Sequence, residues 1–138
     1  MPLGEAIFQR FVRRASDARL ERTLGSGRGL RIIFGAMAKA YRPDRAAGWT
    51  GDIRYELSDS RGAMRTWTVT CGSERAHARE AAAPGPDLTV KVGVADFIRV
   101  AARDLDPAKA LLTGRMDLEG DFAVATRLGE MFGQPPAY

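Results

Sequence analysis

The stretch that decides the fold is DLDPAKALLTGRMDLEGDFAVATRLGEMF, which spans residues 104–132. Its first helix begins at Asp106-Pro107. An aspartate side chain can accept hydrogen bonds from the free amides at the start of a helix. Proline suits the first helical position, because the N–H that it lacks would have no partner there. Gly114 ends this helix, since glycine readily adopts the left-handed conformation found there. The spacing predicts an apolar side made of Ala108, Leu111 and Leu112.

A strand and a last helix complete the stretch. Residues 115–119 alternate between polar and apolar side chains, which is typical of a half-buried strand. Asp121 is the expected N-cap of one helix that runs to residue 132. At about 100° per residue, its apolar side chains cover roughly half the circumference. The helix is therefore expected to be deeply buried in the core, or to use part of this face to line a cavity or to contact a partner. These side chains are Phe122, Val124, Ala125, Leu128, Met131 and Phe132.

Several groups of residues in and before this stretch form a recognisable pattern. They are residues 87–92 with Ala95-Asp96-Phe97, Leu105-Asp106-Pro107 with Ala108 and Ala110, Gly114-Arg115-Met116 with Leu118, and Gly120-Asp121 with Ala125 and Leu128. The pattern resembles the sterol carrier protein type two (sterol-binding) domain family, and the likeness extends more weakly back to Trp49. Members of that family often have a glycine just before the leucine of the Leu-x-Pro run, where this chain has Arg103-Asp104.

The resemblance implies a function. Members of this family bind hydrophobic small molecules in an internal apolar cavity, and the final helix contacts the lipid. For this chain it implies binding of fatty acyl, sterol-like or other lipids, with transfer between a membrane and an enzyme. The implied partners are therefore a hydrophobic ligand and, transiently, a membrane.

Composition limits the classes of protein that fit. The chain has 138 residues, 45% of them hydrophobic and 28% charged, which is ordinary for one globular domain over residues 1–138. No apolar run is long enough to span a membrane and no secretory signal pattern occurs near Met1, so we expect a cytoplasmic protein. The net charge is +4, but the sequence has no block of basic residues interleaved with aromatic residues, so it does not indicate a nucleic acid partner. Cys71 is the single cysteine, which excludes an internal disulfide.

The first part of the chain, residues 1–45, is expected to be helical. Residues 4–24 carry apolar side chains on one side and arginines on the other, which suits a helix that docks on its own domain, on a second subunit or on a membrane surface. Residues 25–29 are rich in glycine, but a phosphate loop needs a preceding strand, so we expect a linker. A second helix follows with apolar spacing at Leu30, Ile33, Phe34, Met37 and Tyr41.

The second part, residues 46–138, begins with strands. Residues 49–57 and 65–71 alternate with period two around a turn at 58–62, residues 74–80 form a short polar edge strand, and another strand starts at Asp87. Residues 94–105 then return to helical spacing. This order predicts an α+β fold, with a mostly antiparallel sheet of about five strands, helices covering one face and an apolar tunnel between the layers.

No group of residues in the sequence indicates catalysis. His77 is the only histidine and lies in a polar segment, which rules out a multi-histidine metal site. Cys71 follows the apolar phase of its strand and is expected in the core. The carboxylates Asp117, Glu119 and Asp121 lack the spacing of a metal loop. We therefore expect no enzyme, no metal and no cofactor.

The remaining function is binding of an apolar molecule. We expect a mostly apolar pocket with few polar contacts. Its predicted lining residues are Met37, Trp67, Phe97, Leu112, Met116, Phe122, Val124, Leu128, Met131 and Phe132. Two alternatives stay open: an accessory or scaffold subunit whose apolar helix face forms a homodimer or binds a partner protein, and a pocket recruited for catalysis in a biosynthetic pathway.

Overall fold

A five-stranded sheet is the central element of residues 3–132, which are the residues that the computed structural model describes. Its strands are β1 (Gly51–Ser58), β2 (Met64–Cys71), β3 (Ala76–Arg79), β4 (Leu88–Gly93) and β5 (Met116–Gly120). They lie in the order β3-β2-β1-β4-β5, with β1 and β4 parallel and the other three pairs antiparallel. The predicted α+β fold with a mostly antiparallel sheet is confirmed.

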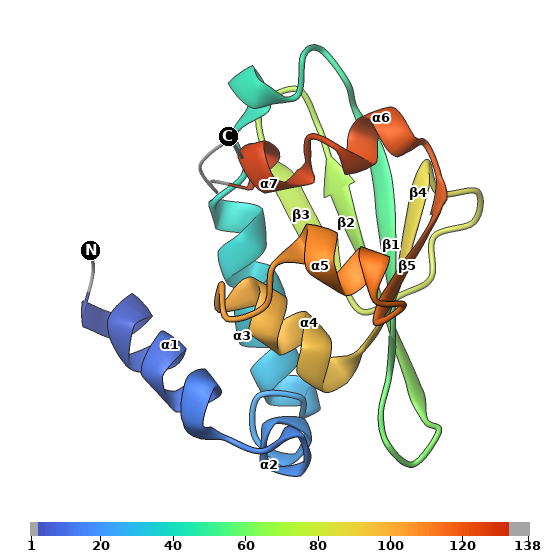
Figure 1. The fold of residues 1–138 in the computed structure, drawn as a ribbon. Helices are drawn as coiled ribbons and strands as arrows, with labels where there is room; N and C mark the ends of the chain where they lie inside the picture. Colours follow the sequence, from blue (N-terminus) through green and yellow to red (C-terminus); the bar gives the residue numbers. More distant parts are fainter. Residues whose placement is uncertain (1–2, 133–138) are drawn as a thin grey trace.

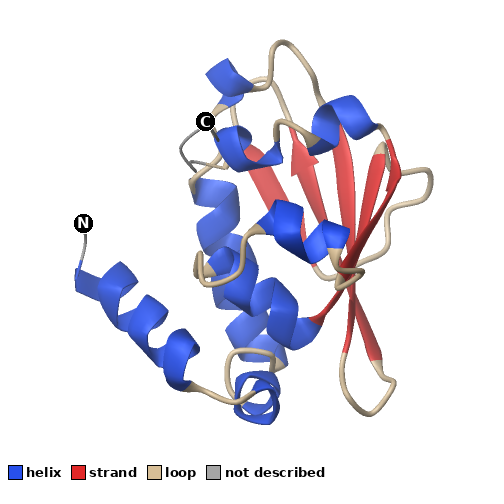
Figure 2. Cartoon of the chain, viewed as in Figure 1, coloured by secondary structure: helices blue, strands red, loops and turns tan. Residues whose placement is uncertain are grey.

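The longer helices gather on one side of this sheet (Figure 1, Figure 2). In chain order the helices are α1 (Leu3–Arg14), α2 (Asp17–Arg22), α3 (Gly27–Lys39), the 3-10 helix η1 (Pro43–Arg45), α4 (Val94–Ala101), α5 (Pro107–Leu112), α6 (Phe122–Ala125) and α7 (Leu128–Met131). In Figure 1, α3 and α4 lie beside the sheet and α1 lies farther from it. Within residues 3–132, no helix has the length and apolar character needed to cross a membrane.

The N-terminal segment differs from its prediction at both ends. The single helix expected over residues 4–24 is two helices, because Ser16 adopts an extended conformation and its side chain caps α2 by accepting from the Arg19 amide at 3.2 Å. The glycine-rich linker is shorter than expected, because Ser26 caps α3 and the helix already begins at Gly27. Local capping by two serines therefore sets these boundaries.

The far face of the sheet is partly covered, although its side chains are polar. Thr68 lies on this face, opposite its neighbours Trp67 and Val69, yet it is completely buried beneath residues 81–83. Its hydroxyl donates to the Ala81 carbonyl at 2.6 Å and accepts from the Ala83 amide at 3.1 Å. A buried hydroxyl must be satisfied in this way, so the proline-rich segment before β4 is fixed against β2.

The end of α4 has a residue other than glycine in the left-handed conformation. Arg103 follows the C-cap Ala102 and has a φ of +62°, in the left-handed region that glycine favours. The Arg103 amide donates to the Val100 carbonyl at 3.0 Å and closes the helix end. The helix therefore ends in a left-handed residue that is not glycine.

Candidate functional site

Four aromatic side chains form the centre of the layer between the sheet and the helices. Phe34 of α3 is completely buried, and its ring stacks on Trp67 at 4.7 Å and on Phe97 at 4.9 Å between centroids. Tyr55 of β1 meets the rings of Phe34 and Phe97 edge-on at 5.3 and 5.7 Å. The sequence analysis predicts Trp67 and Phe97 as lining residues and does not name Phe34 and Tyr55 among them, although both follow the apolar phase of their elements.

A row of side chains crosses the helix-covered face of the sheet from this cluster to its edge. Trp67 is paired with Tyr55, Tyr55 with Val90, and Val90 with Leu118. Paired residues of neighbouring strands project to the same face. Because strands lie about 4.8 Å apart, the row extends about 14 Å. It joins the buried Trp67 to the half-buried Leu118 at the β5 edge.

The ten predicted lining residues lie in three environments. Those buried in the core are Trp67, Phe97, Val124 and Met131. Those half-buried against the same core are Met37, Met116, Leu128 and Phe132. The other two, Leu112 and Phe122, are 87% and 62% exposed. The structure thus brings most of the set to one apolar layer and leaves two members on its outer surface.

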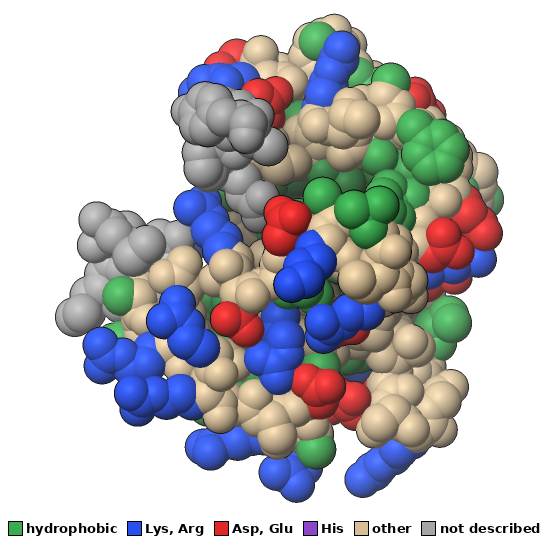
Figure 3. All heavy atoms as spheres, viewed as in Figure 1, with side chains coloured by type: hydrophobic (Ala, Val, Ile, Leu, Met, Phe, Trp, Pro, Cys, Tyr) green, Lys and Arg blue, Asp and Glu red, His purple; other side chains and the backbone are tan. Residues whose placement is uncertain are grey.

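Exposed apolar side chains gather on α5 and α6 next to β5. Leu111 is 41% exposed, and with Leu112 and Phe122 it forms a surface that we call the α5–α6 apolar surface. Hydrophobic side chains are visible over these two helices in Figure 3. The predicted apolar side of α5 was wrong: Ala110 is the buried residue, and Ala108 is exposed with the two leucines. The helix α5 therefore docks through the small side chain of Ala110 and turns its two leucines outward.

The last helix is broken, which corrects its prediction as one continuous element. The Asp121 amide donates to the Asp87 carbonyl at 2.8 Å and fixes the start of α6 to the end of the 81–87 segment. The Arg42 amide donates to the Met131 carbonyl at 2.6 Å and fixes α7 to the chain after α3. The helix is interrupted between these two anchors, at residues 126–127. The segment α6–α7 therefore lies across one end of the apolar layer (Figure 1).

One buried polar atom in this layer has no partner within the described part of the chain. Trp67 is only 4% exposed, and its buried indole Nε1 has no hydrogen-bond partner. Arg54 Nε on the other face of the sheet is also without a hydrogen bond, but it lies 3.2 Å from a Glu56 carboxylate oxygen. An unpaired buried donor costs about 1–3 kcal/mol. Trp67 therefore offers an unpaired hydrogen-bond donor inside a mostly apolar layer.

Cys71 has the environment of a core residue and not of a nucleophile. It is 1% exposed at the end of β2. Burial, with a smaller contribution from the charge of Asp52, raises the pKa of the Cys71 thiol to about 12. Burial in the aromatic cluster likewise raises the pKa of Tyr55. Both groups are therefore neutral at physiological pH.

The raised pKa of Cys71 predicts a pH dependence of stability. The folded thiol ionises at a higher pH than the unfolded thiol, whose pKa is about 8.5. The free energy of unfolding should therefore be constant below about pH 8 and should fall above it, by on the order of 2 kcal/mol at about pH 10. Urea titrations across this range should show the decrease. C71V should lack most of it, and an equal decrease in both proteins would contradict the assignment to the thiol.

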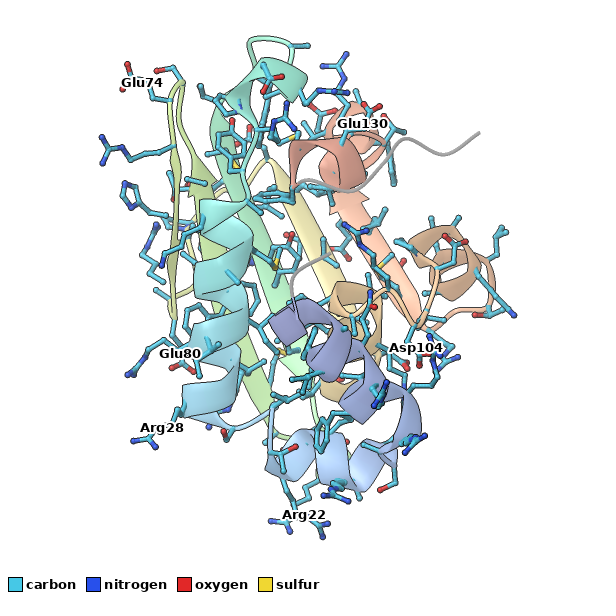
Figure 4. All side chains as sticks on the ribbon, turned by 90° about the vertical axis from the view of Figure 1, so that its left-hand side faces the viewer. Arg22, Arg28, Glu74, Glu80, Asp104 and Glu130 are labelled. Carbon is cyan, nitrogen blue, oxygen red and sulfur yellow. The ribbon has the colours of Figure 1, made fainter. Side chains whose placement is uncertain are left out.

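His77 lies apart from the aromatic cluster. It is exposed on β3 and lines an open hollow of about 400 Å³ between this strand and the second half of α3. Figure 4 shows the same side of the molecule, with Glu74 at the β2–β3 turn. Among residues 3–132, no group of three or more histidine, cysteine or acidic side chains could hold a metal ion.

Comparisons with known proteins show which sequences and structures are similar to this chain. Residues 34–133 match the model of the SCP-2 sterol transfer family. The non-specific lipid-transfer protein-like 1 of Caenorhabditis elegans is 25% identical over 76 residues, which cover 55% of this chain and 64% of that protein. The solution structure of palmitated SCP2L2 from Aedes aegypti has a TM-score of 0.59 and 22% identity, covering 77% of this chain and 96% of that one.

A larger protein also contains this fold. A double mutant of the sec-alkyl sulfatase PisA1, an enzyme of Pseudomonas sp., has a TM-score of 0.61 and 25% identity over 78% of this chain. The matched part is only 16% of the sulfatase chain, so the likeness concerns one portion of that enzyme. The family model covers well over half of the sequence, from the central Phe34 to the end of the last helix. The protein therefore belongs to the SCP-2 sterol transfer family.

Proposed function

We propose that the protein binds a hydrophobic small molecule, of the fatty acyl or sterol-like class, along the apolar row between the sheet and the helices. The α5–α6 apolar surface would be the entrance. The observation that carries this proposal is the exposure of Leu111, Leu112 and Phe122 beside β5, where the row reaches the surface. Large apolar side chains that face water next to an apolar layer favour an apolar ligand.

The ligand site would follow the row inward from β5. Each buried methylene contributes about 0.8 kcal/mol, so a chain of about ten methylenes gains on the order of 8 kcal/mol before the cost of ordering it is subtracted. Met116, at the end of β4–β5 pairing, and Leu128 of α7 are half-buried against the core. Flexible methionine side chains adapt to ligands of different shape. Entry of a ligand would require α6–α7 to move away from the layer.

Binding and entry can be tested together. Native mass spectrometry of the purified protein should detect a co-purifying lipid, and a fluorescent fatty acid should bind saturably at micromolar concentration. F122S should weaken this binding about tenfold, because it removes a phenyl group from the entrance. The matched control is I32S, since Ile32 is 67% exposed on α3, away from the entrance. Failure of every acyl and sterol probe to bind would refute the proposal.

Trp67 would hold the polar end of the ligand. The W67F variant keeps an aromatic ring on Phe34 and removes the N–H that has no partner. We expect its stability to be unchanged or slightly higher, whereas its affinity for a fatty acid should fall about tenfold relative to an alkane of equal length, as loss of one hydrogen bond to a charged acceptor predicts. Calorimetric titration of both ligands measures this. An equal change for both would show that the indole does not contact the polar group.

A second candidate function is that of an accessory domain that presents hydrophobic substrates to an enzyme. The likeness to one portion of an alkyl sulfatase favours it. The binding site would be the same, but a catalytic partner would act on the bound molecule. Binding of an alkyl sulfate more tightly than the matching fatty acid would support this function over lipid transfer.

A further inference from the structure

The corner between α1 and α2 forms a hollow that the lipid proposal does not use. Its volume is about 370 Å³, and it is lined by Ile7, Arg10, Phe11, Arg14, Ala15 and Arg19. We call it the α1–α2 hollow. It lies before residue 34, where the match to the family begins. Basic side chains gather over these two helices in Figure 3. The hollow is therefore a feature of this chain's N-terminal segment.

The arginines of the hollow have no carboxylate partner among the described residues, because the nearby acidic side chains are engaged elsewhere. Asp17 accepts from the Arg99 guanidinium at 2.8 Å. Glu21 accepts from the Ser60 hydroxyl at 2.8 Å and from its amide at 3.2 Å. Neither is ion-paired with Arg10 or Arg14. The hollow consequently combines an apolar floor with uncompensated positive charge.

The floor of the hollow is aromatic and remains accessible. Ile7 is 60% exposed, and Phe11 is half-buried. The Arg19 guanidinium lies 5.3 Å from the centre of the Phe11 ring, a cation–π contact that holds this arginine at the rim. Arginine and aromatic residues in a partly buried depression are typical of the central contacts of protein interfaces.

The corner is held in shape by α4. Arg99 donates to the carbonyl of Val12 at 3.0 Å and to that of Ala15 at 2.9 Å, at the end of α1. Its bond to Asp17 fixes the start of α2 in the same way. In Figure 4, α1 and α2 lie on the viewer's side between Arg22 and Asp104. The hollow is thus preorganised, which lowers the cost of docking.

We propose that the α1–α2 hollow docks an acidic segment of a partner protein. An apolar side chain of the segment would contact Ile7 and Phe11, and flanking carboxylates would pair with Arg10, Arg14 and Arg19. Arginine binds carboxylates through two parallel hydrogen bonds, which suits this arrangement. A bilayer surface is flat and fits a concave site poorly, and an open hollow cannot enclose most of a small ligand as ligand pockets do. A peptide segment can enter a concave site and does not need to be enclosed by it.

The test uses the full chain and a fluorescent synthetic peptide with a leucine-phenylalanine pair flanked by glutamates. We expect saturable binding by fluorescence anisotropy. The R10Q/R14Q variant should bind about tenfold more weakly, and the weakening should diminish at high salt. The control is R28Q/R31Q, which removes the same charge from exposed positions of α3 and should bind as the native protein does. I7S should also weaken binding, without unfolding, because the side chain is exposed.

Two further probes decide between occupants. A peptide with serines in place of the apolar pair should bind more weakly than the first, because it cannot use the floor. Equal binding of both peptides, or equal loss in R10Q/R14Q and R28Q/R31Q, would overturn the proposal. Vesicles that contain phosphatidylserine are the second probe. If they bind with dependence on Arg10 and Arg14 while the peptide does not bind, the hollow faces a membrane and the proposal is wrong.

Discussion

Replacing Phe34 by alanine should lower the free energy of unfolding by about 4 kcal/mol, the largest effect expected of a single substitution in this protein. The ring is fully buried and contacts Trp67, Phe97 and Tyr55 at centroid distances of 4.7, 4.9 and 5.3 Å. Truncation removes the transfer free energy of the ring and the aromatic contacts, and leaves a cavity because neighbours on both layers cannot close it. Urea denaturation followed by circular dichroism measures the loss.

The Phe34 result also bears on ligand binding. For the loss of stability alone, the comparison is F132A, because the Phe132 ring is half-buried, contacts Tyr41 at 5.7 Å and should cost only about 1 kcal/mol. If a lipid occupies the row beside Trp67, a saturating fatty acid should restore more stability to F34A than to the native protein. A loss below about 2 kcal/mol would contradict the prediction and would show that the layer repacks around the missing ring.

Replacing Arg99 by methionine should cost about 2–3 kcal/mol, because a network centred on one half-buried guanidinium is lost. The Arg99 side chain is 15% exposed and donates to the carbonyls of Val12 and Ala15 and to the carboxylates of Asp17 and Asp104. Methionine keeps the length and apolar stem but leaves two carbonyls without their donor. The expected loss of stability is smaller than for a fully buried ion pair, because the Asp17 side chain is 66% exposed.

Three measurements separate this prediction from a simple loss of charge. R13M removes an arginine that is 76% exposed and 3.9 Å from Asp104, and it should change stability by less than about 0.5 kcal/mol. R99K keeps the charge but cannot reach two carbonyls and a carboxylate together, so it should recover less than half of the loss. Hydrogen exchange in α1 and α2 should accelerate in R99M before the sheet is affected. Unchanged exchange there would contradict the role of Arg99.

Much of the fold follows from local sequence signals. The alternation in residues 49–57 and 65–71 predicts β1 and β2, and the helical spacing of Leu30, Ile33 and Phe34 predicts α3, because period two and period 3.6 expose different sets of side chains. The caps Asp106 and Asp121 predict the starts of α5 and α6, and both accept from amides of the first turn. These features depend on residues within a few positions of one another.

The broken last helix could not be predicted in the same way. Its two anchors are the Asp87 carbonyl and the Arg42 amide, which are 34 and 89 positions from their partners Asp121 and Met131. Nothing in the periodicity of residues 122–132 records those contacts. The same holds for α5, where the docking of Ala110 against neighbouring elements, and not the pattern of the helix, leaves Leu112 exposed.

By itself, the sequence determined the types of element, the single apolar face of the sheet, the burial of Cys71 and the likeness to a lipid-binding family. Only the tertiary structure decided that β1 and β4 pair in parallel, which aligns Trp67, Tyr55, Val90 and Leu118 in one row. It also decided that Asp17 bonds to Arg99 and Glu21 to Ser60, so that the arginines of the α1–α2 hollow have no carboxylate partner among the described residues. The physical reason is that periodicity reports each element's own apolar side, whereas burial and charge compensation depend on contacts between residues far apart in the chain.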